Sequence, residues 1–331
     1  MDQLVKKEAM MKAIWMEKTG GPEVLQLVDR PTPQPGLGEV LVDVAAAGVN
    51  FMDVGTRTGM YTQMPLPMTP GVEGAGRVAR LGAGVNGFAV GDRVAWFYAI
   101  QSYAQQIAAP AAALVPLPDG VVLHTAAAVM MQGLSASHFV TETYAIKPGD
   151  WALVHSAAGG LGLMLTQMIK ILGGKVIGRV SAIEKIAIAR AAGADEVIVS
   201  ADGNFADDVR RLTGGSGVRV VYDGAGADTF AGSVASLDYH GVLAYYGQTI
   251  KRQAPIDLLD LPRSILVSYP SVIHHVRTRE ALLKWSGRLF DWLLADQLKV
   301  SIGRRYPLAQ AAQAHRDIQS RSTTGKLLLI P

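Results

Sequence analysis

One short segment, Trp151–Lys170, constrains the fold of this chain more than any other. It begins with a largely apolar stretch of strand length, turns through Ser156–Gly162, and continues with apolar residues at helical spacing. Strand, glycine turn and helix in this order hold a dinucleotide pyrophosphate in many proteins, because the helix N-terminus offers unpaired N–H groups and its positive dipole end. Ala157 replaces the first glycine of the usual G-x-G-x-x-G pattern. The pattern alone therefore fits any glycine-rich α/β turn, and its place between strand and helix favours a nucleotide.

The rest of the chain predicts two kinds of domain. From Lys12 to about Pro118, short β-rich runs alternate with Gly and Pro turns, which indicates a mostly β domain. From about Pro148, strands and helices alternate, which predicts a doubly wound α/β domain with a parallel sheet and helices on both faces. The expected strands of this sheet are Trp151–His155, Lys175–Val180, Glu196–Ser200, Val218–Asp223 and Gly241–Gly247.

The C-terminal part has no place left in that sheet, so we expect it to return to the β domain. It comprises a long helix (Arg279–Asp296), a second helix (Ala309–Ser320) and a terminal strand (Lys326–Ile330). The predicted organisation is residues 11–130 with 272–331 as the β domain, 131–271 as the nucleotide-binding domain, and 1–10 as an N-terminal extension.

Composition excludes several classes of protein. Hydrophobic residues make up 49% of the 331 and charged residues 18%, so the chain is a compact globular protein. The net charge of +3 comes without a basic run, which argues against nucleic acid and anionic membrane as partners. The uncharged stretch 121–141 contains histidine, glutamine and hydroxyl side chains, which favours a buried helix over a membrane span. Cysteine is absent, which fits a reducing cytoplasm.

Seven motifs in order carry a resemblance to a known family. They are Gly20–Leu25, Gly48–Asp53, Pro70–Gly76, Val90–Val94, Ala157–Gly162, Val220–Asp223 and Ser320–Gly325. Over residues 11–331 the chain resembles the quinone oxidoreductases, or zeta-crystallin-like proteins, of the zinc-free branch of the medium-chain dehydrogenase/reductase superfamily. The resemblance implies a GroES-like β domain closed by the C-terminal segment, an inserted Rossmann domain, and catalysis in the cleft.

The resemblance also implies that no metal takes part. Zinc-dependent relatives have Cys at the position that resembles Asn50 and His at that of Val72. A catalytic zinc needs about three protein ligands. Only His274 and His275 are close in the sequence, and adjacent residues of an extended chain point to opposite faces. The sequence therefore predicts no metal site.

Without a Lewis acid, hydride transfer needs an acceptor that is already electrophilic, such as a quinone or a conjugated C=C bond. The resemblance implies that Asn50 donates to the substrate oxygen or the nicotinamide carboxamide, that Tyr61 shapes the pocket and could supply a proton, and that Ser135 lies near the nicotinamide. The alternatives are a strand-end cap for Asn50, a surface turn residue for Tyr61 and an ordinary helix hydroxyl for Ser135. Asp53 and Arg57 are expected to fix this loop by charge pairing.

Two departures from the family pattern leave the natural acceptor open. Gly55 stands where the family commonly has Tyr, which predicts a wider cleft. Gln132 stands where the family has Lys, which removes a contact for an anion.

The choice of cofactor rests on the end of the second strand. NAD-specific folds place Asp or Glu there, whereas Lys175–Ser181 contains no acid. Gly178, Ser181 and Lys185 match the family positions around a 2′-phosphate, Arg321 matches a basic residue from the tail, and Ser200 replaces a family Tyr. These residues predict NADPH. The full cofactor set is Asn50, Ser135, Ala158, Gly159, Gly160, Leu161, Gly162, Gly178, Ser181, Lys185, Gly247, Gln248 and Arg321.

The leading hypothesis is a cytoplasmic, metal-independent NADPH:quinone oxidoreductase. One alternative is an NADPH-dependent ene-reductase that acts on an enone, a substituted acrylate or an enoyl thioester. Another, suggested by zeta-crystallin relatives, is an NADPH-binding structural or RNA-binding protein. A homodimer is expected because the apolar strand Gly241–Gly247 is predicted to end the sheet, and such edges invite pairing; otherwise the chain's own tail covers this edge.

Overall fold

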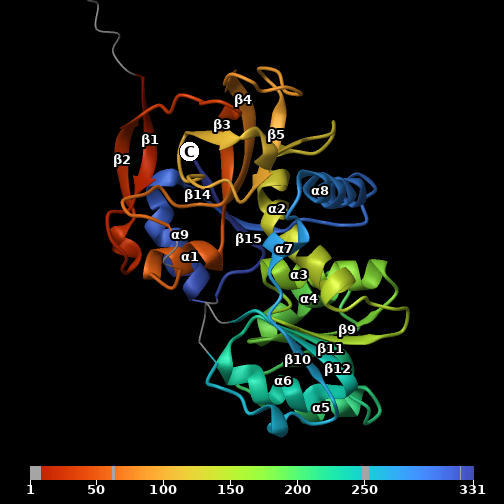
Figure 1. Ribbon diagram of the computed structural model, residues 1–331. Helices are drawn as coiled ribbons and strands as arrows, with labels where there is room; N and C mark the ends of the chain where they lie inside the picture. Colours follow the sequence, from red (N-terminus) through yellow and green to blue (C-terminus); the bar gives the residue numbers. More distant parts are fainter. Residues whose placement is uncertain (1–8, 62–63, 248–252, 321) are drawn as a thin grey trace, which may run out of the picture. The chain divides into compact units, whose positions relative to one another are not determined.

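The computed structural model describes residues 9–61, 64–247, 253–320 and 322–331 (Figure 1). Its contacts divide the chain into two compact units. The β unit comprises the chain up to Met130 together with Ile302–Pro331, and the sheet unit comprises Met131–Ser301. A mostly antiparallel β fold in the first and a parallel sheet with helices in the second confirm the predicted fold class. Residues 1–8 of the predicted N-terminal extension lie outside the described residues.

The β unit is organised around its longest strand, β3. It contains a two-stranded sheet, β1–β2, and a seven-stranded sheet in the order β14-β15-β3-β4-β5-β7, with β6 also paired to β3. The strands are β1 (Met10–Trp15), β2 (Gln26–Pro31), β3 (Glu39–Val49), β4 (Glu73–Leu81), β5 (Arg93–Phe97), β6 (Gln106–Pro110), β7 (Leu114–Pro116), β14 (Ile302–Pro307) and β15 (Lys326–Ile330). The helices are α1 (Phe51–Thr58), α9 (Ala311–Gln319) and the first half of α2 (Leu123–His138).

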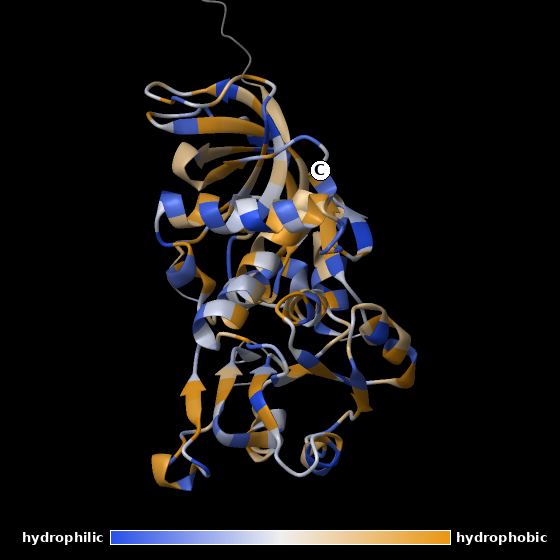
Figure 2. Cartoon of the chain, turned by 90° about the vertical axis from the view of Figure 1, so that its right-hand side faces the viewer, coloured by the Kyte–Doolittle hydropathy of each residue, from blue (hydrophilic) through white to orange (hydrophobic). Residues whose placement is uncertain are grey.

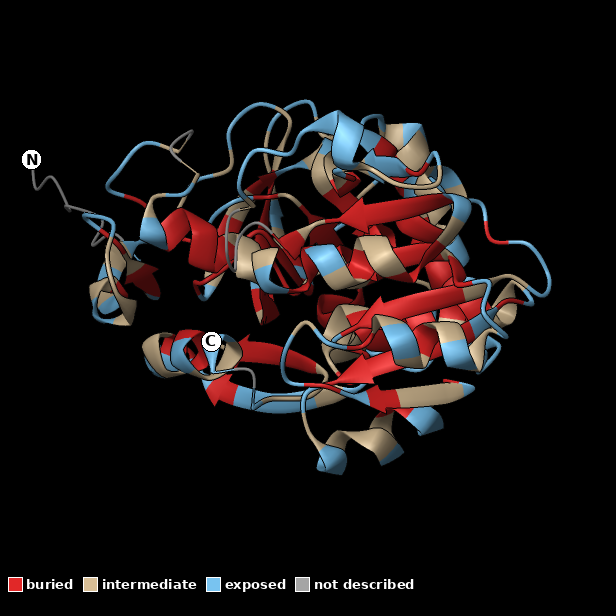
Figure 3. Cartoon of the chain, turned by 90° about the horizontal axis from the view of Figure 1, so that it is seen from below, coloured by how far each residue is buried: buried red, intermediate tan, exposed pale blue. Residues whose placement is uncertain are grey.

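The C-terminal strand returns to this sheet, as the sequence predicted. β15 pairs antiparallel with β3, so that Leu327 lies opposite Val49. The first four residues of β15 are buried. They include Lys326, which lies beside the end of β3. Figure 3 shows buried residues concentrated in the strands, with exposed residues on loops and on the outer faces of helices.

The sheet unit has the order β10-β9-β8-β11-β12-β13, and every described pair in it is parallel. Its strands are β8 (Trp151–His155), β9 (Lys175–Val180), β10 (Glu196–Val199), β11 (Val218–Asp223), β12 (Leu237–Tyr245) and β13 (Leu266–Ser268). Its helices are α3 (Gly160–Ile171), α4 (Ile186–Ala191), α5 (Ala206–Leu212), α6 (Phe230–Ser236), α7 (Val272–His275) and α8 (Arg279–Leu294).

The connections of this sheet create a switch point. The chain runs outward from β8 through β9 to β10 and then returns to the other side of β8 at β11. Helices α3 and α4 consequently cover one face and α5 and α6 the other (Figure 1). In such sheets a ligand binds beyond the carboxyl ends of the strands, where the order reverses.

The strands of the sheet unit are apolar along most of their length, as parallel strands buried on both faces must be. Leu153, Ile177 and Val221 are fully buried and belong to one hydrophobic core. In Figure 2 the strands of this sheet carry orange segments that are interrupted by pale and blue ones. In the described part of the chain, no helix combines the length and apolarity needed to cross a bilayer.

Two details differ from the sequence-based expectation. Residues 272–301 fall in the sheet unit, whereas we expected them in the β domain. Their contacts explain this, because Lys299 bonds Gln167 of α3 through both its N–H and its carbonyl. The prediction that Gly241–Gly247 ends the sheet is wrong, since β12 lies between β11 and the short edge strand β13.

Candidate active site

The glycine turn lies between β8 and α3 as predicted. Gly159 is the N-cap of α3 and has no side chain that could cap the first N–H groups of the helix. A Cβ at Gly162 would lie 2.8 Å from Cα of Ala157, so only glycine fits there. Ser156 has φ 50°, a strained backbone of the kind that clusters at binding sites. The turn thus presents bare backbone and a helix N-terminus at the carboxyl end of β8, which suits a pyrophosphate.

The residues predicted for the 2′-phosphate gather at the end of β9. Gly178 belongs to β9, and Ser181 follows the strand directly. Nζ of Lys185 lies 3.2 Å from Oγ of Ser181, so the structure brings this hydroxyl and this cation together. Ser200, in the place of the family Tyr, donates a hydrogen bond to the carbonyl of Asp202 at 2.9 Å.

The other predicted cofactor residues of the sheet unit have different surroundings. Gly247 follows β12, and a Cβ there would lie 2.9 Å from the carbonyl carbon of Gly224, so two backbone segments approach closely. Ser135 is buried on α2. Gln132, three residues earlier, places its side-chain amide against the Cα of Gly160 in the glycine turn. Gln248 and Arg321 lie outside the described residues.

In the β unit, Asn50 belongs to a buried network with Glu73 and Lys326. Nζ of Lys326 donates to Oδ1 of Asn50 at 2.7 Å and also to Oε1 of Glu73. Nδ2 of Asn50 donates to Oε1 of Glu73 at 2.8 Å. Because an ammonium group only donates, its contact fixes which end of the Asn50 amide carries the oxygen. Asn50 is also the N-cap of α1, at the end of β3. Its backbone therefore has the capping position that the sequence offered as the alternative role for this residue.

A second buried network holds the start of α1. Oδ2 of Asp53 accepts from the N–H of Asn50 at 2.9 Å and from the hydroxyl of Tyr103 at 3.0 Å. That hydroxyl also lies 3.2 Å from Nε2 of His315 on α9. Burial raises the pKa of Asp53 to about 7 and lowers the pKa of His315 to about 3. The network therefore anchors the residue that precedes α1 to the tail of the chain.

The expected charge pair between Asp53 and Arg57 does not form. Both residues are buried on α1, but Asp53 bonds Asn50 and Tyr103, whereas Arg57 donates to Oε1 of Gln319 at 2.8 Å. Tyr61 follows α1 and is half-buried, and its N–H donates to the carbonyl of Gly55. The structure brings Asn50 into contact with Glu73 and Lys326.

Sequence reasoning missed a third network, at the carboxyl ends of β8 and β11. Oδ2 of Asp223 accepts from Ser233 at 2.7 Å, and Nε2 of His155 lies 3.0 Å from the same hydroxyl. Nη1 of Arg179 lies 3.3 Å from Nδ1 of His155. Burial lowers the pKa of His155 to about 4, so the ring is neutral near pH 7. The position of His155 and Asp223 at two strand ends was the available signal.

Comparison with known proteins agrees with this arrangement. Two family models match, one described as alcohol dehydrogenase GroES-like domain over residues 36–119 and one as zinc-binding dehydrogenase over residues 160–288. Quinone oxidoreductase 1 of Escherichia coli is 37% identical over 329 residues, covering 97% of this chain and all of that protein. A 2-haloacrylate reductase of Burkholderia is 34% identical, covering 97% of this chain and 99% of that protein.

Solved structures of similar proteins agree with the sequence comparisons. A mycobacterial protein solved in complex with NADPH has a TM-score of 0.93 and 42% identity, covering 97% of this chain and all of that one. The β unit with its returning tail and the doubly wound sheet are the architecture of a medium-chain dehydrogenase/reductase. Within that class, the chain belongs to the quinone oxidoreductase family.

Proposed function

We propose that this chain is an NADPH-dependent oxidoreductase that reduces quinones without a catalytic metal. The observation that carries the proposal is the end of β9, where Ser181 and Lys185 meet and where Lys175–Ser181 contains no acidic residue. A cation and a hydroxyl suit the 2′-phosphate of NADPH, whereas an acid at this place would hold the free 2′-hydroxyl of NADH. The name of the E. coli relative, a quinone oxidoreductase, supports quinones as acceptors, and the mycobacterial structure in complex with NADPH supports the cofactor.

The residues of the glycine turn fit the cofactor. Gly159, Gly160 and Gly162 leave backbone where side chains would fill the space, and α3 begins there. Ala158, Leu161, Gly247 and Gln248 complete the proposed pyrophosphate and nicotinamide side, and Arg321 is proposed for the 2′-phosphate. Gln248 and Arg321 lie outside the described residues. When bound, NADPH supplies a hydride to the acceptor.

The chain's own residues prepare the acceptor site. Lys326 and Glu73 hold both ends of the Asn50 carboxamide, so this side chain enters the reaction already oriented. One Nδ2 hydrogen is directed at Glu73, and the other is left to donate to an acceptor oxygen or a carboxamide, since its contact with the Gly48 carbonyl is long at 3.5 Å. A donor in this place stabilises the negative charge that develops on a quinone oxygen. We assign Tyr61 and Ser135 to the same reaction as shaping and positioning residues.

The proposal that no catalytic metal is needed is based on the side chains at two positions. Asn50 and Val72 stand where zinc-dependent relatives have Cys and His, and Val72 is a buried apolar residue that cannot be a ligand. An acceptor that needs no Lewis acid is therefore required, and quinones meet that requirement.

The second candidate function is reduction of an activated C=C bond, which the Burkholderia 2-haloacrylate reductase favours. A panel of NADPH-oxidation assays separates the two, with 9,10-phenanthrenequinone, 1,4-naphthoquinone, 2-chloroacrylate and an enoyl-CoA as acceptors. We expect kcat/KM to be highest with the quinones. A higher value with chloroacrylate or the thioester identifies an ene-reductase, and NADPH binding without turnover on the whole panel identifies a structural or RNA-binding protein.

The proposed assembly is a homodimer. The edge strand β13 exposes Leu266 and Val267, which are 63% and 40% accessible. Close by in the sequence, Leu258 and Leu259 are also exposed. An apolar edge strand is a template for pairing with a second chain, so a second copy of this chain is the partner that best fits it.

A further inference from the structure

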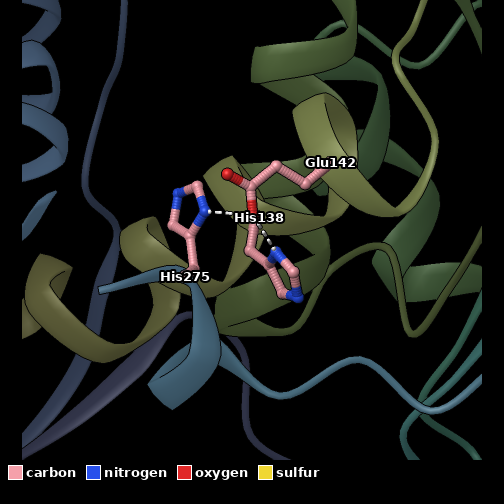
Figure 4. A group of neighbouring side chains, drawn as sticks. All are labelled: His138, Glu142 and His275. Carbon is pink, nitrogen blue, oxygen red and sulfur yellow. Dashed lines mark hydrogen bonds and ion pairs between the residues drawn. The ribbon is translucent and has the colours of Figure 1, made fainter. Parts of the chain in front are cut away.

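Two histidines and a glutamate meet in the sheet unit, at positions that the reductase reaction does not use. His138 is the last residue of α2, Glu142 lies in the π-helical turn Phe139–Thr143 that follows, and His275 ends α7. Figure 4 shows both imidazole rings directed at the carboxylate of Glu142. Nδ1 of His138 lies 3.2 Å from Oε2 of Glu142, and Nδ1 of His275 lies 2.9 Å from the same oxygen.

The hydrogen bonds of the described residues do not satisfy the ring nitrogens of His275. Its side chain is fully buried, yet neither ring nitrogen makes a hydrogen bond with the residues that the structure describes. The 2.9 Å contact to Glu142 has the distance of a hydrogen bond and lacks its alignment. Buried polar atoms in folded proteins nearly always have a partner, and an ion is one of the partners that a structure can lack.

The three groups have the spacing and the chemistry of a metal site. A ligand atom from each of the three lies within 4.8 Å of the others. Metal–ligand bonds of about 2.0–2.2 Å put neighbouring ligands of a tetrahedral ion roughly 3.4 Å apart, close to the two measured distances. Two imidazoles and one carboxylate are a donor set for zinc and similar divalent transition metals. Glu142 is half exposed, so a water molecule can complete the coordination.

The surroundings hold the imidazoles in place before an ion arrives. The ring of His275 lies between those of His138 and Trp285, with centroids 5.0 and 4.4 Å away. Packing of this kind preorganises ligands. π-helical turns are rare and occur frequently at functional sites, and one carries Glu142.

We propose that His138, Glu142 and His275 form a binding site for a divalent transition-metal ion of the zinc class. The site is distinct from the positions of Asn50 and Val72, where zinc-dependent relatives hold their catalytic metal. A bound ion links α7 to the end of α2, so its first consequence is a more stable sheet unit.

The test uses the whole chain, freed of metal with a chelator and dialysed, and Co²⁺ alone as the probe. We expect one Co²⁺ per chain with the visible absorption bands of a nitrogen- and oxygen-ligated ion, displaced by Zn²⁺. Glu142→Gln and His275→Gln should each weaken binding by at least about tenfold, because even outer-shell partners contribute about 10- to 100-fold to metal affinity. His274→Ala, at the exposed neighbour of His275, is the matched control and should bind as the wild type does.

Thermal unfolding gives a second readout. At one fixed Zn²⁺ concentration, the Tm of the wild type and of His274→Ala should rise clearly more than that of Glu142→Gln, since stabilisation by a ligand grows with its affinity for the folded state. Glu142 is half exposed, so its isosteric amide keeps the fold even if the buried His275 does not tolerate change. Absence of Co²⁺ bands in the wild type, or equal binding by Glu142→Gln, overturns the proposal.

Discussion

At the scale of single residues, the buried ammonium of Lys326 fixes the orientation of the Asn50 carboxamide. Lys326 and Glu73 are 1% and 0% exposed and bond each other and Asn50. Two opposite charges buried together repay their desolvation only when both are present, so loss of one partner leaves the other charge uncompensated. Lys326 therefore stabilises the fold and, through Asn50, also contributes to the proposed acceptor site.

We predict that Lys326→Met lowers the free energy of unfolding by about 3–5 kcal/mol. Denaturant unfolding measures this change. The double variant Lys326→Met, Glu73→Gln should recover most of the loss, because no buried charge remains. Lys12→Met removes an exposed ion pair with Asp29 and should cost no more than about 1 kcal/mol. Equal losses in Lys326→Met and Lys12→Met would contradict the buried-charge account.

Asp53 introduces a dependence of stability on pH. Burial raises its pKa from 3.8 to about 7. Between these values the unfolded chain has released a proton that the folded chain still holds, so ionisation opposes folding. The stability that this group contributes is present below about pH 4 and is lost as the pH rises to about 7.

We predict that Asp53→Asn, which cannot ionise, becomes more stable relative to the wild type as the pH rises through this window. The full difference in pKa corresponds to about 4 kcal/mol. Urea unfolding of both proteins at several pH values measures it. The difference between them is the informative quantity, because His155, with its pKa lowered to about 4, changes stability in the opposite sense. A pH-independent difference would show that Asp53 ionises normally.

Lys185 should decide between the two nicotinamide cofactors. We predict that Lys185→Ala raises KM for NADPH by roughly tenfold or more, since a charge-assisted contact with phosphate contributes about 1.5–3 kcal/mol. KM for NADH should change little. Steady-state kinetics with both cofactors and one quinone give the ratio. An unchanged preference for NADPH means that Lys185 and Ser181 do not contact the phosphate.

At the scale of elements, the sequence predicts the bounds of strands better than it predicts which strands pair with each other in the sheet. The bounds of β8, β9, β11 and β15 agree with the expected ones, because each is an apolar run bounded by turn residues. The edge strand β13 has three residues and forms by pairing with β12, so it leaves no periodic signal. This is why Gly241–Gly247 was placed at the edge in error.

The edge strand supports a prediction about assembly. We expect Leu266→Lys to convert the proposed dimer to a monomer, because a charge on an edge strand blocks pairing with another strand. Light scattering coupled to size-exclusion chromatography measures the mass. Leu37→Lys is the matched control, since Leu37 is also an exposed leucine but lies in the β unit. A wild type that runs as a monomer, or a Leu266→Lys variant that stays dimeric, would contradict this assembly.

At the scale of the whole molecule, the two kinds of site residue differ in how far the sequence reveals them. The glycine turn is contiguous, and its place between an apolar strand and a helix indicated a nucleotide site. Lys326 reaches Asn50 across 276 positions and Glu73 across 253, and no local pattern joins them. The same holds for His275, which meets His138 and Glu142 only in the folded chain, although the four-residue spacing of the latter two was visible.

We propose that NADPH reduces a quinone at a site that Asn50 completes. The most direct measurement is the rate of NADPH oxidation with 9,10-phenanthrenequinone for the wild type and for Asn50→Ala, with circular dichroism to establish that the variant is folded. We predict quinone-dependent turnover by the wild type and a kcat about 100-fold lower in the variant, the size expected for one preorganised donor. A wild-type rate no faster than the reaction without protein, or equal kcat in the two proteins, would contradict it.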